Sequence, residues 1–213
     1  MNRVLFGLFA VIALAGCQSS SVTKEEEYVK LKARPARPKE TRPLVAVTDF
    51  VDKSNYGQGR LGSGAADVLT TELLKSQQVR TLERQQLSKA LDELKLQHSG
   101  VTDANTAKQV GKMLNAKYVI YGAITNFGMH VEANDFVLVN NKTQIAECEV
   151  DVRIIEVETS EAVYGMNGNG RADKTVSGSI VGGGRSSFDE KLAGRALRAA
   201  IVKMLDDMLD QMD

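Results

Sequence analysis

Residues 44–82, LVAVTDFVDKSNYGQGRLGSGAADVLTTELLKSQQVRTL, decide the class of fold. They begin with a short apolar run at 44–50 and pass through a polar, glycine-rich loop at 51–62. Apolar residues then recur at helical spacing from 63 to 75, and a second short strand is predicted at 79–82. A strand, a helix and another strand in this order are typical of a mixed α/β fold.

The rest of the chain continues this pattern with longer elements. Apolar residues at helical spacing predict helices at 85–96 and 104–114, and Thr102 and Asp103 precede the second as capping residues. Three more strands are predicted, at 117–127, at 143–157 and from 161 towards 170. With an amphipathic helix at 189–212, we expect an α/β protein: a mixed-sheet sandwich with extended β-hairpins and a C-terminal helix.

The N-terminus has the layout of a secreted, lipid-modified protein. Arg3 precedes an apolar run at 4–14, which is too short to span a bilayer as a helix and ends in the string LAGC at 14–17. A cysteine at the cleavage point resembles the bacterial lipobox, whose sulfur carries a diacylglycerol. We therefore predict that residues 1–16 are a signal peptide and that Cys17 is the lipidation site. The alternative is an ordinary secretory signal with a chance cysteine.

The residues after Cys17 predict where the protein is held. Gln18 stands where inner-membrane retention signals prefer aspartate, so we expect the inner leaflet of the outer membrane, with the protein facing the periplasm. Residues 17–43 hold all three prolines and show no helical or strand period, which predicts a flexible tether before a domain at 44–213. Its basic residues are expected either to be solvated or to rest on anionic head groups or peptidoglycan carboxylates.

Strict alternation at 146–154 predicts a strand with one buried face. The apolar side consists of Ala146, Cys148, Val150, Val152 and Ile154. Lipidation would occupy Cys17, so Cys148 has no partner within the chain. We expect Cys148 in the core, with an intermolecular disulfide as the alternative.

Composition and motifs give no support for an enzyme. Basic and acidic residues balance at 27 each, so no global charge attracts nucleic acid. The string GQGRLG at 57–62, with Glu83 beyond it, matches a dinucleotide-binding pattern, but six residues separate it from the preceding strand. The two histidines, His98 and His130, lack neighbours at metal-ligand spacing. We expect no catalytic residues, cofactor, metal or small-molecule substrate.

Several strings together resemble the CsgG/HfaB family of outer-membrane lipoproteins. They are VAVTDFVDK at 45–53, GAADVLTTEL at 64–73, LERQ at 82–85, AKYVIYG at 116–122 and VRIIEV at 152–157. LERQ before an amphipathic helix is the most distinctive of them. The resemblance implies a periplasmic α/β domain similar to the TolB N-terminal domain, which assembles into a ring under the outer membrane.

In the curli and holdfast exporters of this family, two hairpins per subunit insert as strands of a shared barrel through which adhesin or fibre subunits pass. The corresponding hairpins here would be 125–150 and 167–187, although neither offers a clear lipid-facing band. The glycine-rich stretch at 165–184 is predicted to be a mobile hairpin tip. The methionine-rich stripe of the 189–212 helix would line either a subunit interface or, preferably, the core.

The resemblance favours a homo-oligomeric assembly or export protein of the outer membrane. The alternative is a lipoprotein that regulates an envelope enzyme such as a peptidoglycan synthase, since such regulators share a similar fold and a long tether.

Overall fold

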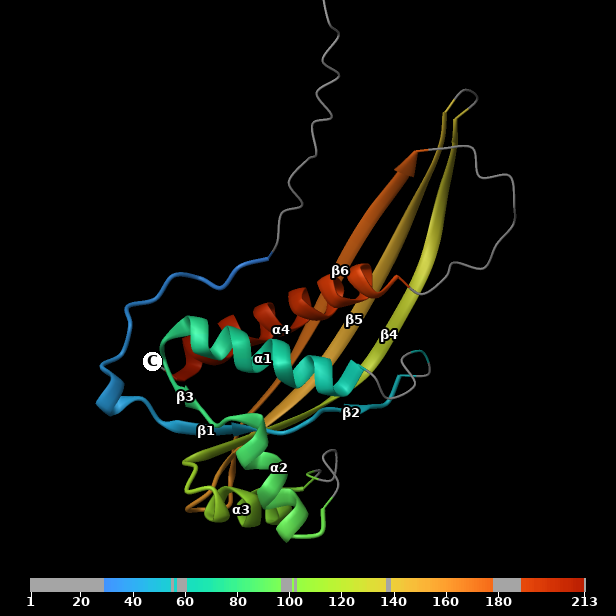
Figure 1. Cartoon of the computed structure of the whole chain (residues 1–213). Coiled ribbons are helices and arrows are strands. Elements are labelled where there is room, and N and C mark those ends of the chain that lie inside the picture. Colours follow the sequence, from blue (N-terminus) through green and yellow to red (C-terminus); the bar gives the residue numbers. More distant parts are fainter. Residues whose placement is uncertain are drawn as a thin grey trace, which may run out of the picture.

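Three long antiparallel strands run side by side through the molecule and extend beyond its helices (Figure 1). In this computed structural model the described residues are 29–54, 56, 61–96, 101, 103–136, 139–177 and 189–212. The strands are β1 Leu44–Val47, β2 Val51–Asp52, β3 Arg80–Thr81, β4 Tyr118–Phe136, β5 Val139–Glu156 and β6 Ala162–Ser177. The helices are the 3-10 turn η1 Lys39–Thr41, α1 Leu61–Ser76, α2 Arg84–Glu93, α3 Ala104–Met113 and α4 Glu190–Met212.

The sheet is mixed, with the strand order β3-β1-β4-β5-β6, and β2 also pairs with β4. Parallel pairing joins β1 to both β3 and β4, while β4, β5 and β6 are antiparallel to one another in turn. β1 and β3 are short, and the helix α1 forms the crossover between them, as the sequence predicted. The expected α/β class with extended hairpins and a C-terminal helix is confirmed.

The three long strands exceed their predicted lengths. β4 continues to Phe136, β5 starts at Val139 and β6 reaches Ser177, through segments rich in polar residues. Strand pairing is made by the backbone, so polar residues on both faces do not interrupt it, although they hide it from a search for apolar alternation. The first expected hairpin, 125–150, is confirmed as the β4–β5 hairpin. Of the second, 167–187, residues 167–177 pair with β5 and the remainder lies outside the described residues.

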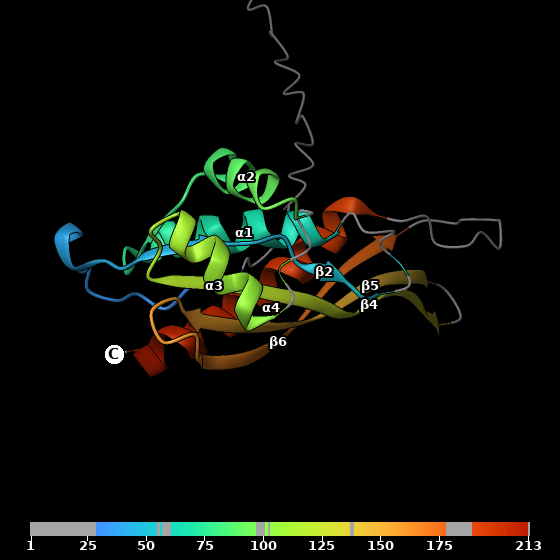
Figure 2. The same ribbon diagram turned by 90° about the horizontal axis from the view of Figure 1, so that it is seen from below.

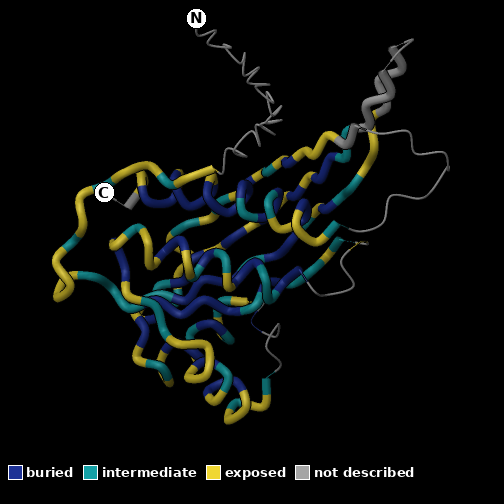
Figure 3. Tube along the Cα trace, turned by 45° about the horizontal axis from the view of Figure 1, so that its top comes forward, coloured by how far each residue is buried: buried dark blue, intermediate teal, exposed yellow. Residues whose placement is uncertain are grey.

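The helices α1 and α4 cover one face of the sheet (Figures 1 and 3). The larger core lies between these two helices and the sheet. The apolar side of β5 points into this core, as predicted. Cys148 is only 1% exposed there, and burial raises the pKa of its thiol to about 12. The methionine stripe of α4 is also core: Met204 and Met208 are at most 1% exposed, so the alternative of a subunit interface is wrong for these residues.

The helices α2 and α3 cover the opposite face, so the domain has three layers: two helices, the sheet and two helices. Figure 2 shows that β4, β5 and β6 continue past α2 and α3. Val119 and Ile155 of the sheet pack there against Leu91 and Val110. Asp103 caps α3 by accepting the N–H groups of Asn105 and Thr106 at 2.9 and 3.0 Å.

Glycines in β6 let α4 approach the strand closely. A Cβ added to Gly168 would lie 2.2 Å from the carbonyl oxygen of Ala200, and one at Gly170 would lie 2.1 Å from that of Ala196. The prediction of a hairpin tip at 165–184 is therefore wrong for 165–177, where the glycines are packing positions inside a strand. None of the helices in the described ranges combines the length and hydropathy needed to cross a bilayer.

Candidate functional site

The residues predicted as special by sequence are dispersed. Cys17 lies outside the described residues, as do residues 57–60 of the glycine-rich loop. Gly62 is in the first turn of α1, where a Cβ would come within 2.0 Å of the carbonyl oxygen of Phe50, so it serves close packing. Glu83 is the exposed N-cap residue of α2. Within the described ranges, no three His, Cys, Asp or Glu side chains come together as metal ligands.

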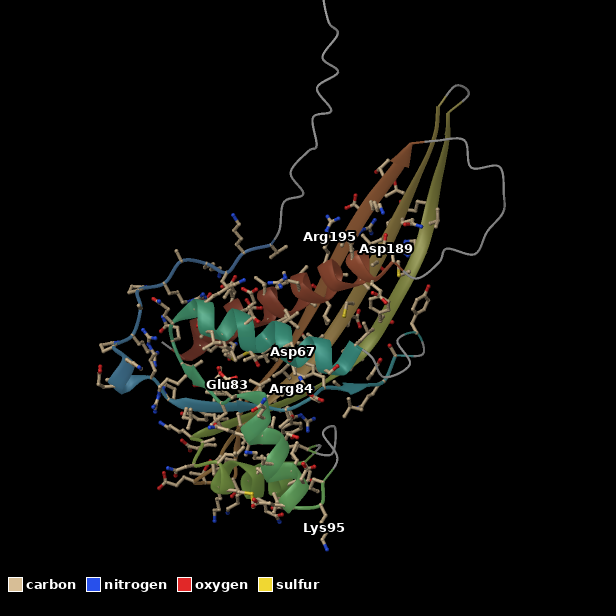
Figure 4. All side chains as sticks on the ribbon, in the orientation of Figure 1. Asp67, Glu83, Arg84, Lys95, Asp189 and Arg195 are labelled. Carbon is tan, nitrogen blue, oxygen red and sulfur yellow. The ribbon has the colours of Figure 1, made fainter. Side chains whose placement is uncertain are left out.

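Three of the strings that suggested the family meet at Arg84 (Figure 4). One guanidinium nitrogen donates to both carboxylate oxygens of Asp49, at 2.8 and 2.9 Å, and another donates to Asp67 at 2.7 Å. Asp49 follows β1, Asp67 is on α1 and Arg84 opens α2. The distinctive LERQ string therefore fastens the first βαβ unit together, which is a structural role. Sequence alone could not reveal this role, because the three residues are far apart along the chain.

A segment from residue 29 to residue 43, here called the strap, lies along the molecule beside the ends of α1 and α4 (Figure 1). Most of it belongs to the surface, yet Arg34 is an exception, with a side chain only 8% exposed. Arg34 donates to a carboxylate oxygen of Asp206 at 2.8 Å and to its carbonyl oxygen at 2.9 Å, and it also pairs with Asp210. The backbone N–H of Lys32 donates to Asp206 at 3.0 Å.

We call these contacts of Arg34 and Lys32 with α4 the clasp. A further contact holds the middle of the strap, where the side-chain amide of Gln78 donates to the carbonyl oxygen of Pro35 at 2.7 Å. Within the expected flexible tether, Lys32, Arg34 and Pro35 therefore contact the domain. The sequence of residues 29–43 did not predict this contact with α4, because a partner more than 170 positions away leaves no local period.

The ribbon of β4, β5 and β6 has two strand edges without a neighbour in the described part of the chain. β6 ends the sheet, and β4 has lost its pairing to β1 and β2 beyond Ile124. Part of the β6 edge is protected, since Arg195 of α4 donates to the carbonyl oxygen of Asp173 at 3.3 Å (Figure 4). Unpaired edges of this kind are templates for pairing with another chain.

The face of the ribbon that turns away from α4 is polar. Arg171 of β6 pairs with Glu147 of β5 at 3.2 Å and lies 3.9 Å from Glu132 of β4. Beside them, Ile145 is fully buried, in register between His130 and Asp173. A lipid-facing strand needs an apolar side chain at every second position over about 9–11 residues. The described side chains on this face do not form such a band.

Comparison with known proteins places this architecture in a family. The family model described as "Curli production assembly/transport component CsgG" matches residues 24–213, and one for a "Prokaryotic membrane lipoprotein lipid attachment site" matches residues 1–18. A Neisseria meningitidis serogroup B protein named "Putative lipoprotein NMB1126/NMB1164" is 29% identical over 215 residues, which is 96% of this chain and 91% of that protein.

Several solved structures are similar at a distance. The LpoB C-terminal domain from Salmonella enterica has a TM-score of 0.45 at 18% identity and covers 64% of this chain and 86% of its own. Lipoprotein GNA1162 from Neisseria meningitidis has a TM-score of 0.45 at 9% identity, with coverages of 80% and 97%. The PelC dodecamer from Paraburkholderia phytofirmans has a TM-score of 0.38 at 16% identity, with coverages of 82% and 93%.

The family model spans the strap, every described strand and every described helix. The chain therefore belongs to the CsgG family of lipoproteins.

Proposed function

We propose that this protein is anchored through lipidated Cys17 to the inner leaflet of the outer membrane and acts, as a ring of identical subunits, in the assembly or export of a surface structure. Membership of the CsgG family supports the class of function. The lipid attachment match over residues 1–18 supports the anchor, since several acyl chains on one cysteine hold a protein stably on a membrane.

The observation that carries the ring is the pair of unpaired edges on the ribbon. They lie on opposite sides of the same three strands, so the β6 edge of one subunit can meet the β4 edge of the next. A head-to-tail contact of this kind closes into a ring when the rotation between subunits permits. β4 and β6 are each antiparallel to β5 and so run in the same direction, which means that cyclic neighbours would pair in parallel.

Paired cysteines test this contact. His130 and Asp173 are opposite the same residue of β5, both are exposed, and they lie on the two edges of the ribbon. In a chain carrying His130→Cys and Asp173→Cys, oxidation should produce a ladder of covalent oligomers. The matched control replaces His130→Cys by Lys89→Cys on the exposed surface of α2 and should stay mostly monomeric. Equal ladders from both chains would contradict edge pairing.

The clasp bears on how far the domain can reach from the membrane. It leaves the eleven residues 18–28 between Cys17 and the bound strap, which can span at most about 40 Å when fully extended. A tether that ran to residue 43 would reach about 90 Å. The shorter reach favours a role close to the outer membrane over regulation of a distant peptidoglycan synthase. Crosslinking in cells tests this, because a synthase as the main partner would favour the regulator.

A further inference from the structure

A groove with an excess of positive charge lies where the strap meets the end of the sheet. It has a volume of about 410 Å³, and its lining includes the basic and aromatic side chains of Arg37, Arg42, Arg80, Lys117, Tyr118 and Tyr164. Glu40 is the one acidic residue among those that line it. Four cations against one carboxylate give a surplus of three positive charges in a chain whose formal net charge is zero.

Two of the guanidinium groups are held in place by the backbone. The Nε of Arg42 donates to the carbonyl oxygen of Arg37 at 2.7 Å, and the Nε of Arg80 donates to that of Arg42 at 3.1 Å. Neither arginine has an acidic partner in the part of the chain that the structure describes, so their terminal nitrogens are not engaged by a carboxylate there. Oriented arginine donors of this kind suit carboxylate or phosphate oxygens.

The aromatic side chains add a second kind of contact. Tyr118 and Tyr164 are half-buried on neighbouring parts of the groove, and the ammonium of Lys117 lies 5.1 Å from the centre of the Tyr118 ring. A tyrosine presents an apolar ring together with a polar hydroxyl, which suits the mixed surface of a sugar. Cations beside tyrosines therefore match a sugar polymer that carries carboxylates.

We propose that this groove binds a carboxylate-bearing glycan, the chemistry of peptidoglycan. The position of the groove favours this polymer over the head groups of the anchoring membrane. The groove lies by η1, at the far end of the strap from Val29, where the chain comes from its lipid (Figure 1). This proposal does not depend on the ring, because all the residues that line the groove belong to one chain.

The test is co-sedimentation of the full lipoprotein, in detergent, with purified peptidoglycan sacculi at low and high salt. The groove variant carries Arg42→Gln and Arg80→Gln, and the control carries Lys89→Gln and Lys191→Gln, which remove the same charge from exposed positions outside the groove. Removing charge-assisted contacts should weaken binding by the groove variant by about tenfold. The control should bind like the native protein.

A second variant guards against misfolding, because Arg42 and Arg80 also bond the backbone. Lys117→Gln leaves those bonds in place and should weaken binding several-fold with an unchanged unfolding temperature. Sacculi whose carboxylates have been amidated should also bind weakly. Equal loss in the groove variant and the control would overturn the proposal. So would binding of the protein to micelles containing phosphatidylglycerol while native sacculi stay unbound, since the groove would then be a phosphate site.

Discussion

Arg34 is the residue through which the strap can be released without touching the core. Arg34→Ala removes one nearly buried cation that bonds Asp206 twice and Asp210 once. An exposed ion pair contributes about 0–1 kcal/mol, whereas breaking a buried one costs about 3–5 kcal/mol. The side chains of Arg34 and Asp206 are 8% and 12% exposed, but that of Asp210 is 49% exposed, so the pair lies between these limits. We expect a loss of about 2 kcal/mol.

This loss should appear as opening of the strap rather than as unfolding of the domain. A change of about 2 kcal/mol raises the open population by about thirtyfold. The strap offers trypsin three cleavage sites, after Lys30, Lys32 and Lys39, because each of its arginines is followed by a proline, which blocks cleavage. Limited proteolysis should therefore cut the strap of Arg34→Ala about thirtyfold faster at these lysines, while the domain from α1 to α4 stays intact.

Lys30→Ala is the matched control, because it also removes one strap cation and its side chain is exposed, and the two variants are compared at Lys32 and Lys39, which both retain. It should leave the cleavage rate at the other sites within a factor of two of native. Equal rates for Arg34→Ala and Lys30→Ala would refute the clasp and, with it, the short reach of the anchor.

Three further outcomes follow from packing and charge. Gly168→Ala should lower the free energy of unfolding by about 1–3 kcal/mol, because its Cβ meets the α4 backbone, whereas Gly165→Ala has open space and should be close to neutral; denaturant unfolding of both checks this. Cys148 should resist maleimide at pH 8 until the protein is denatured, and rapid labelling of the native protein would contradict its burial and its pKa of about 12. The pKa of Asp210 is lowered by hydrogen bonds from Lys32 and Arg34. Protection of the strap amides from hydrogen exchange should therefore be complete above pH 4 and lost as the pH falls through that lowered pKa. Protection that vanished between pH 7 and pH 5 would contradict this assignment.

Local patterns in the sequence predicted most of the elements because those elements bury one face. The period of the last helix and the alternation around Cys148 both report a side chain that points into the core, and both were confirmed. The parts of β4 beyond Phe127, of β5 before Thr143 and of β6 beyond Gly170 escaped prediction because backbone pairing between the strands, which leaves no apolar period, holds them together. Glycines at 168 and 170 were misread for a related reason: their small size serves a helix above the strand, not a turn.

Features that depend on distant residues left no local signal. The clasp joins Arg34 to Asp206, and the Arg84 cluster joins β1, α1 and α2. The basic groove likewise combines strap residues with Arg80, Lys117 and Tyr164. The sequence shows that the strap is basic, but it does not show that its cations have two roles. Lys32 and Arg34 bind α4, whereas Arg37 and Arg42 line the groove.

The mass of the native lipoprotein, extracted in mild detergent and measured particle by particle, tests the ring most directly. We expect one dominant species whose protein mass is a fixed multiple of the mature chain, with ring-shaped particles in electron micrographs of the same sample. A single-chain mass at every concentration, together with micrographs that lack rings, would contradict the proposal.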